Sequence, residues 1–410
     1  MQKPKIRNIS IRRSYYQGEP VFLMQDSLHL TEGAIVLPQA LGPLVLLCDG
    51  SHTLPEIQAA LEVRYGLRLS SDLLQSLISQ FDQALLLEGK TFEQANQRAV
   101  ADYRAAPYRQ PLSAGHSYPA DPEKLRQTLQ GYLNQVNGAI TTNPTYRGMI
   151  SPHIDYGRGG PVYAQVWASM AEAIRQAELV IILGTDHNGG TPASLTLTCQ
   201  SYATPLGIVP TDQALVGRIA QALDPQTVFA GELLHRGEWS IELVLVWLQY
   251  LRGDNPCPVL PVLVGSFHHF MTGQAKIDEE TNFKVFLDVL HAEMAQRRTL
   301  IVASGDLAHL GPEFDTPPLD KPAQIQMEQD DRALLATLCE GQADAFFDFM
   351  QAGQYERNVC GLSPFYFSMN LLGQAQGKTI AYGRCPAEPN GRGFNPNGAS
   401  FVSVCGLVWE

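Results

Sequence analysis

Five side chains that can bind metals or transfer protons follow short apolar runs or precede predicted helices: His153, His187, Asp306, His309 and Cys360. A metal centre needs neutral imidazole, thiolate or carboxylate groups that converge from separate elements. The backbone dipoles of the helix predicted after Cys360 would favour its thiolate. Asp306 and His309 could form an acid–base pair, or the carboxylate could orient a ligand histidine. Each residue type is also common in structural roles, so type alone leaves both interpretations open.

A predicted strand–helix–strand unit positions the first two histidines. Apolar runs at 148–150 and 179–183 are separated by a segment, 161–176, with the spacing of a helix. His153 and His187 each follow one of these runs. Open α/β sheets bind ligands beyond the carboxyl ends of their strands, so we expect the two rings to lie close together.

The rest of the main domain continues this alternation. It predicts a three-layer α/β sandwich with a mostly parallel sheet. The expected buried strands are 259–264 and 300–303, the expected helices are 211–223, 238–251, 283–297, 323–339 and 363–372, and 379–382 and 399–407 are expected edge strands.

Three other polar features receive ordinary interpretations. Glu238 and Glu242 are spaced i, i+4 on a predicted helix, and we interpret them as a solvated face rather than a carboxylate pair. We interpret the adjacent histidines 268–269 as surface residues. Residues 157–160, Gly-Arg-Gly-Gly, lack the phosphate-loop lysine and favour a tight turn over an anion cradle.

Composition and charge narrow the class of protein. With 410 residues, 45% of them hydrophobic, the chain can bury at least two cores. Residues 1–110 hold 11 basic and 11 acidic residues, so the remainder holds 29−11 = 18 basic and 41−11 = 30 acidic residues. The main domain therefore carries the whole net charge of −12, which argues against nucleic acid as its ligand.

The cysteines and the apolar runs indicate the cellular compartment in which the protein is expected. The 7 cysteines form no CxxC pair and are odd in number, which suits a reducing cytosol better than a disulfide framework. The basic start of the chain lacks the apolar core of a signal peptide, and no run is long enough to span a bilayer. We therefore expect a cytoplasmic protein that does not associate with a membrane.

Residues 1–90 predict a small α+β domain of winged-helix-like form. Short strands are expected at 20–24 and 34–37, and 85–87 could enter a wing strand. We place a helical linker at 91–111 and the main α/β domain at 112–410.

The helices of this small domain have clear boundary signals. Thr53 and Glu56 form a capping box, and the helix that they open should end at Gly66. Ser70 or Ser71 should cap the next helix. The pattern LCDGSHTLPEIQ followed by LLQSLISQFDQALLL resembles the PqqD-like peptide-binding fold, which implies that the domain presents a peptide to a radical-SAM or other modifying enzyme. A structural or docking role stays open beside peptide binding. DNA binding is disfavoured because the candidate recognition helix contains no basic residue.

The main domain resembles the Memo family, also known as AmmeMemoRadiSam system protein B. The resemblance runs from about residue 112 to 408 through AGHSYPADPEKLR, ISPHIDYGRGG, ILGTDHNGG, EWSIELVLVWLQYL, PVLVGSF, ASGDLAHLG and NVCGLSPF, in the family's order. It implies the fold of class III extradiol dioxygenases, which are non-haem iron enzymes, and a metal-type cleft. His153, His187 and Cys360 match the family's two histidines and its cysteine. Asp306 and His309 match its Asp-x-x-His.

The chain departs from the family pattern in this cleft. The pattern Glu-His-Ser is Glu238-Trp239-Ser240 here, and Asn188 and Val244 stand where some members have further histidines. Tryptophan can line a pocket but offers no imidazole nitrogen. We therefore predict Asn188, Glu238 and Trp239 as pocket residues beside a site with fewer imidazoles.

Two functions follow as hypotheses. In the first, His153, His187 and Cys360 bind iron, copper or zinc, Asp306 and His309 are catalytic, and redox or dioxygenase-like chemistry acts on a small aromatic or peptidyl substrate with a radical-SAM partner. In the second, the cleft is a degraded metal site in a non-catalytic module that binds a peptide or partner. The residues leave open whether the protein is an enzyme.

Overall fold

A computed structural model describes residues 3–26, 28–31, 34–136, 142–188, 194–387 and 400–410. The chain divides into two compact units: an N-terminal unit made mainly of residues 1–106, and a body that begins at Pro107 and ends at Glu410. Within the described residues, no helix combines the length and the apolar character needed to cross a bilayer.

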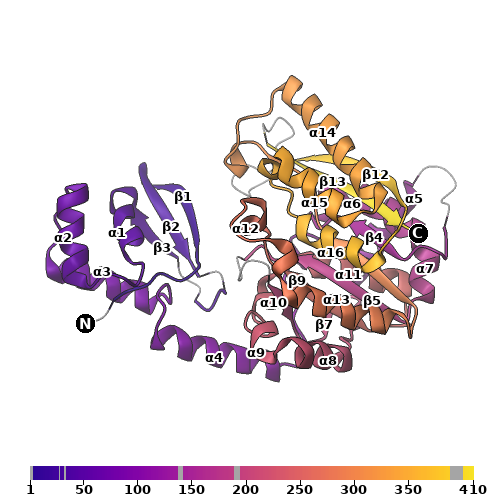
Figure 1. Ribbon diagram of the computed structural model, residues 1–410, viewed down its shortest axis with the longest axis horizontal. Helices are drawn as coiled ribbons and strands as arrows, with labels where there is room; N and C mark the ends of the chain where they lie inside the picture. The colour runs from indigo at the N-terminus through magenta and orange to yellow at the C-terminus, as the bar shows by residue number, and fades with distance from the viewer. Residues whose placement is uncertain (1–2, 27, 32–33, 137–141, 189–193, 388–399) are drawn as a thin grey trace. The chain divides into compact units, whose positions relative to one another are not determined.

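The N-terminal unit combines an antiparallel sheet with helices (Figure 1). Its strands are β1 (Ser10–Tyr16), β2 (Glu19–Gln25) and β3 (Ile35–Pro38), in the order β1-β2-β3. Its helices are η1 (Gln39–Leu41), α1 (Gly42–Leu47), α2 (Leu54–Tyr65), α3 (Ser71–Gln83) and α4 (Lys90–Ala105). The predicted strands at 20–24 and 34–37 are confirmed as β2 and β3. β1 escaped prediction because both of its faces are exposed, so it lacks an apolar alternation.

The boundary signals of α2 and α3 act as expected. Thr53 and Glu56 form both bonds of the capping box, and Gly66 ends α2 with a left-handed φ of 67°. The Ser70 side chain accepts a hydrogen bond from the Leu73 amide and caps α3. The prediction that residues 85–87 enter a wing strand was wrong. Leu85 has a φ of 59°, which interrupts an extended path, and only a single bridge joins Leu87 to Ile6.

The sheet of the body has four parallel strands at its centre. Its order is β11-β13-β4-β10-β5-β9-β6, with β12 paired to β13. β4, β10, β5 and β9 are parallel, and β13 and β6 flank them in antiparallel pairings. The strands are β4 (Gly148–Ser151), β5 (Leu179–Thr185), β6 (Leu195–Leu197), β9 (Val259–Val264), β10 (Thr299–Ser304), β11 (His309–Leu310), β12 (Gly377–Pro386) and β13 (Phe401–Trp409), with a separate pair β7 (Tyr202–Thr204) and β8 (Gly207–Val209).

Helices pack against this sheet in layers (Figure 1). Ile181 and Leu183 of β5 share one apolar core with residues of α13 and α16, while α6 and α11 contact the central strands and each other through Tyr163 stacked on Trp247. The helices are α5 (Pro122–Asn134), α6 (Tyr156–Ser169), α7 (Ala171–Gln176), α8 (Gln213–Leu223), α9 (Pro225–Val228), α10 (Leu234–Gly237), α11 (Ser240–Arg252), α12 (His268–Met271), α13 (Thr281–Met294), α14 (Lys321–Glu340), α15 (Ala343–Phe349) and α16 (Leu362–Leu372). The predicted α/β body with a mostly parallel centre is confirmed.

Two local expectations were wrong. β13 is not an edge strand, because β12 pairs along one side of it while β4 and β11 pair with its two ends on the other side, and its residues are almost all buried. Residues 157–160 form no separate turn. They belong to the first turn of α6, where the Asp155 side chain accepts the Arg158 amide as an N-cap.

Candidate metal centre

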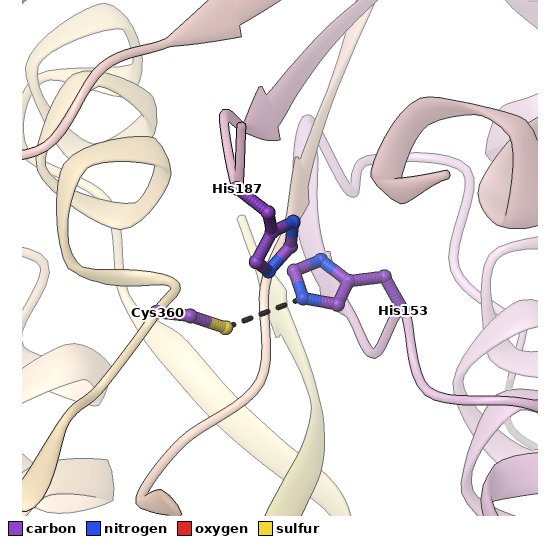
Figure 2. Close-up of side chains that lie close together, drawn as sticks. All are labelled: His153, His187 and Cys360. Atoms are coloured by element: carbon purple, nitrogen blue, oxygen red, sulfur yellow. Dashed lines mark hydrogen bonds between the residues drawn. The ribbon is translucent and has the colours of Figure 1, made fainter. Parts of the chain in front are cut away.

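Two histidines and a cysteine meet at the carboxyl ends of the central strands (Figure 2). His153 lies just beyond β4, His187 just beyond β5, and Cys360 in the turn before α16. One ligand atom from each residue lies within 4.8 Å of the other two. They open into a cavity of about 1260 Å³ that Trp239 and Asp306 also line. The structure thus brings together three residues that are up to 207 positions apart in the sequence.

His153 is the most deeply buried member of the group, with 2% of its surface exposed. Its amide donates to Asp306 Oδ1 at 2.9 Å, and its Nδ1 lies 3.4 Å from the Ser304 hydroxyl of β10. These contacts direct Nε2 to the Cys360 sulfur at 3.2 Å, the dashed line in Figure 2. Neighbouring strand ends therefore set the position of this ring before any ligand binds.

His187 is held by the buried carboxylate of Glu238. Glu238 Oε2 accepts the His187 amide at 2.8 Å, and Oε1 lies 3.0 Å from the ring Nδ1. The same carboxylate accepts the amides of Trp239 and Ser240, which open α11. The solvated face predicted for Glu238 and Glu242 was wrong, since both side chains are 0% exposed. Their i, i+4 spacing fits a buried face as well as a solvated one.

The charges of His187 and Glu238 stabilise each other. Burial alone would lower the pKa of His187, but the Glu238 carboxylate and the hydrogen bonds to Cys360 and Glu238 raise this pKa well above its usual value. Burial alone would raise the pKa of Glu238, but the charge and hydrogen bonds of His187 lower it to about 2. The ring therefore donates Nδ1–H to an ionised carboxylate, and Nε2 is directed at Cys360. This carboxylate–histidine pairing is common behind metal-bound imidazoles.

Cys360 has a thiol that ionises near neutral pH. Its half-buried sulfur accepts the Asp306 amide at 3.3 Å and faces both histidines. Burial would raise the pKa of this thiol, but the His153 charge and hydrogen bonds from His153 and His187 lower it to about 7. The group therefore supplies thiolate, the form that binds metals and acts as a nucleophile.

Asp306 and His309 also lie close to the Cys360 sulfur. With Cys360 they form a second group whose ligand atoms lie within 4.8 Å of one another. The His309 Nδ1 lies 3.1 Å from the carbonyls of Leu307 and Asn358, which can only accept, so the ring carries its proton there. Burial lowers the pKa of His309 although Asp306 opposes the shift. Burial also raises the pKa of Asp306, against the effect of His309. His309 is therefore neutral at pH 7, with Nε2 as its basic atom.

The remaining predicted pocket residues differ in placement. Trp239 lines the cavity, and its indole stacks on the His187 ring with centroids 4.3 Å apart and an interplanar angle of 13°. Asn188 is half-buried and is not among the described residues of the cavity wall. His268 is exposed, as expected of a surface residue, and His269 is half-buried on α12.

Sequence reasoning missed the buried cluster of Arg109, Tyr118 and Glu242. Both charged side chains are fully buried, and Glu242 accepts hydrogen bonds from Arg109 and from the Tyr118 hydroxyl. It also missed His116, an exposed imidazole on the cavity wall. Glu242 directly precedes the apolar run 243–248 of α11 and was an available signal, because a carboxylate buried there needs a cation nearby.

The donor set fits a transition metal. Ligands on one ion such as zinc lie about 3–4 Å apart when the bonds measure roughly 2.0–2.3 Å, so small side-chain rotations would close the three atoms around an ion. Two imidazoles with one thiolate suit iron, copper or zinc, and poorly suit magnesium or calcium.

Comparison with known proteins identifies relatives of the body. The sequence pattern of the Memo-like protein family matches residues 109–386. A MEMO1 family protein from Methanopyrus kandleri is 29% identical over 290 residues, which span 67% of this chain and 91% of the relative. One from Methanosarcina mazei is 30% identical over 266 residues, or 62% of this chain and 83% of the relative.

A further relative also covers the N-terminal unit. A MEMO1 family protein from Aquifex aeolicus is 24% identical over 384 residues, which span 93% of this chain and 94% of the relative. Residues 107–410 alone make up roughly three quarters of the chain, so this alignment includes much of the first 106 residues.

Proposed function

The chain belongs to the Memo-like protein family, and on that premise we propose that it is a metal-dependent oxidoreductase with dioxygenase-like chemistry. His153, His187 and Cys360 hold iron, copper or zinc at the floor of the cleft. The observation that carries this proposal is the convergence of their ligand atoms to within 4.8 Å.

The protein's own residues prepare the donors. A bound iron or copper ion supplies electron transfer and Lewis acidity, and zinc supplies Lewis acidity alone. Glu238 fixes His187 with its proton on Nδ1, which keeps the Nε2 lone pair for a metal once the second ring proton leaves. Cys360 contributes thiolate at neutral pH because its pKa is about 7. Protonation of these two groups competes with metal binding, so affinity rises with pH.

Asp306 and His309 handle protons beside the metal. His309 accepts a substrate proton at Nε2, because two backbone carbonyls keep its own proton at Nδ1. Asp306 stabilises the imidazolium that forms and, through its bond to the His153 amide, keeps the first histidine in place. This division gives a general base and a separate metal centre within one cleft.

The cleft suits a small aromatic or peptidyl substrate. Its volume of about 1260 Å³ leaves room for a substrate beside the metal centre, and Trp239 and Phe314 provide aromatic walls. Arg158 and His116 add polar groups to the lining of the cavity. A ring could stack there while its polar substituents face the donor set.

Metal analysis of the full chain tests this function. Protein purified without a histidine tag should contain close to one equivalent of iron, copper or zinc, and His153→Ala and Cys360→Ala should each lower the affinity for the added ion by at least about 100-fold. Oxygen uptake with a panel of catechols and aromatic peptides then identifies turnover. The proposal is wrong if the wild type holds no metal and its metal content does not respond to these variants.

A second candidate, a non-catalytic binding module, is favoured by one observation. Trp239 covers His187 and lines the cavity at a position where the family pattern has histidine. In this reading the cleft grips a side chain of a peptide, and the N-terminal unit and a radical-SAM protein act as binding partners. Trp239→His distinguishes the two: restored imidazole should raise turnover from a background level in a degraded site, and should leave turnover unchanged or lower it in a site that is already active.

A pull-down with the full chain tests the partner. The expected result under either function is retention of the radical-SAM protein, and its absence under reducing, anaerobic conditions would contradict the partnership.

A further inference from the structure

The carboxylate of Glu242 is the centre of a buried cluster behind the metal centre. It lies in the first turn of α11 and accepts hydrogen bonds from four donors: the Arg109 guanidinium, the amides of Leu112 and Ser113 at 2.7 Å each, and the Tyr118 hydroxyl at 2.5 Å. Leu112 and Ser113 also line the cavity. One carboxylate therefore fixes both a cation and a wall of the cleft.

Arg109 extends this cluster to the residue that holds His187. Its Nη2 donates to the main-chain carbonyl of Glu238 at 2.7 Å, and its Nε donates to the carbonyl of His235 at 3.0 Å. Arg109 thus binds the main chain of Glu238, while the Glu238 side chain binds His187. A continuous set of contacts runs from Glu242 through Arg109 and Glu238 to the imidazole.

The energetics favour a role in geometry rather than in stability alone. Desolvation of a buried ion pair costs about as much as the attraction returns, and well-packed apolar residues often serve stability equally well. What the pair provides is direction, since the planar guanidinium presents several donors at fixed angles. In this cluster three of those donors reach three different acceptors, two of them in the segment that leads into Glu238.

We propose that Arg109 and Glu242 are positioning residues for the metal centre. They hold the Glu238 main chain, and through its carboxylate they set the orientation of His187, while Glu242 also fixes the wall at 112–113. Neither residue touches the metal or the substrate. The inference rests on the proposed function only in taking His187 as a metal ligand.

The test uses the full chain with Glu242→Gln and Arg109→Lys. Glutamine keeps the shape of the side chain and loses the charge, and lysine keeps the charge and loses the fork that reaches both carbonyls. The first readout is the ¹H–¹⁵N resonance of the His187 Nδ1–H in metal-free protein. The second is the Zn²⁺ dissociation constant, measured by competition with a chelator. Both variants should move the resonance and weaken Zn²⁺ binding by about 10-fold, the usual effect of lost outer partners.

A matched control separates positioning from stability. Arg297→Met breaks a half-buried ion pair with Asp212 and Glu293, none of which lines the cavity. It should lower the melting temperature and leave both readouts unchanged. If the two cluster variants lower the melting temperature yet leave the His187 resonance and the Zn²⁺ affinity unchanged, the positioning role is overturned.

The two readouts also separate this inference from the proposed function. If the wild type binds none of iron, copper and zinc, the proposed function fails, and the metal-free resonance still decides whether Arg109 and Glu242 position His187. If Glu242→Gln does not fold, Arg109→Lys decides the question, and an unmoved resonance in that variant contradicts the proposal.

Discussion

The two sides of the cleft hold their metal-binding groups by different means. On one side, His187 meets a carboxylate directly, through the bond between its Nδ1 and Glu238. On the other side, no carboxylate bonds the Cys360 sulfur in the described structure, and this sulfur meets a backbone amide and two imidazoles. Both sides are backed by a fully or almost fully buried ion pair, Arg109 with Glu242 and Arg357 with Asp331.

The difference separates orientation from reactivity. A carboxylate behind an imidazole fixes the tautomer and the ring plane, so the His187 side determines where a ligand atom lies. Amide and imidazole donors around a sulfur favour its thiolate, so the Cys360 side determines how readily a group ionises. Arg357 lies three residues before Cys360 and pairs with Asp331 from α14. This ion pair therefore anchors the turn that carries Cys360, whereas the pair of Arg109 and Glu242 anchors Glu238, the partner of His187.

The largest expected difference between the sides is in stability. His187→Ala should lower the free energy of unfolding by about 3 kcal/mol, because it leaves the Glu238 carboxylate buried without its cation. Cys360→Ala should cost about 1 kcal/mol or less, since alanine is also a small apolar residue at a half-buried site. Urea unfolding of the metal-free proteins measures both values. Equal costs for the two variants would remove the distinction between the sides.

The next effect is the pH dependence of the Cys360 thiol. The Cys360 pKa of about 7 predicts that alkylation of the metal-free protein by iodoacetamide rises about 10-fold between pH 6 and 8 and then levels off. The folded-state pKa lies below the value of an unfolded cysteine. The resulting stabilisation is therefore complete above the unfolded pKa and is lost as the pH falls through 7.

Other cysteines of the chain supply the control for this measurement. Burial raises the pKa of Cys48 and of Cys385 to about 12, so neither should react in this pH range. Mass spectrometry of the labelled peptides assigns the reaction. A midpoint above pH 8 for Cys360 would contradict the proposed influence of the two histidines.

The smallest expected effect comes from two matched hydroxyl deletions. Tyr118→Phe removes one donor from Glu242, and Tyr382→Phe removes the hydroxyl that donates to Asp331 at 2.7 Å. Each should cost about 1 kcal/mol, the typical worth of one hydrogen bond, or slightly more for a charged acceptor. Hydrogen exchange should speed up about fivefold near 235–240 in the first variant and near 355–361 in the second. Faster exchange in both segments for either variant would show that the two anchors are coupled.

Local signals made much of the architecture predictable. The apolar runs before His153 and His187 predicted the strand–helix–strand unit, and β4 and β5 confirm it. The two histidines meet because parallel strands leave their carboxyl ends at one edge of the sheet. Thr53, Glu56 and Gly66 predicted the bounds of α2 correctly, because helix capping depends only on nearby residues. The meeting of Cys360 with the histidines followed from the family resemblance and not from spacing.

The parts that escaped prediction depend on contacts distant in sequence. Arg109 and Glu242 are 133 positions apart, so no periodicity could link them. The sequence could not show whether the Glu238 side chain is buried or exposed, because a charged residue at the start of a helix is compatible with both. β13 resembled an edge strand because polar and small residues interrupt its apolar run, although β12 covers one side of it.

The place of Arg109 in the chain matters for anyone who shortens this protein. It lies three residues beyond Ala106, where the N-terminal unit ends, and it is the first residue of the family match. A fragment that starts at Pro107 keeps the guanidinium, whereas one that starts at 112 leaves Glu242 buried without a cation, at a cost of about 3–5 kcal/mol. Such a fragment could lose metal through that cut alone, with all three metal-binding residues still in its sequence.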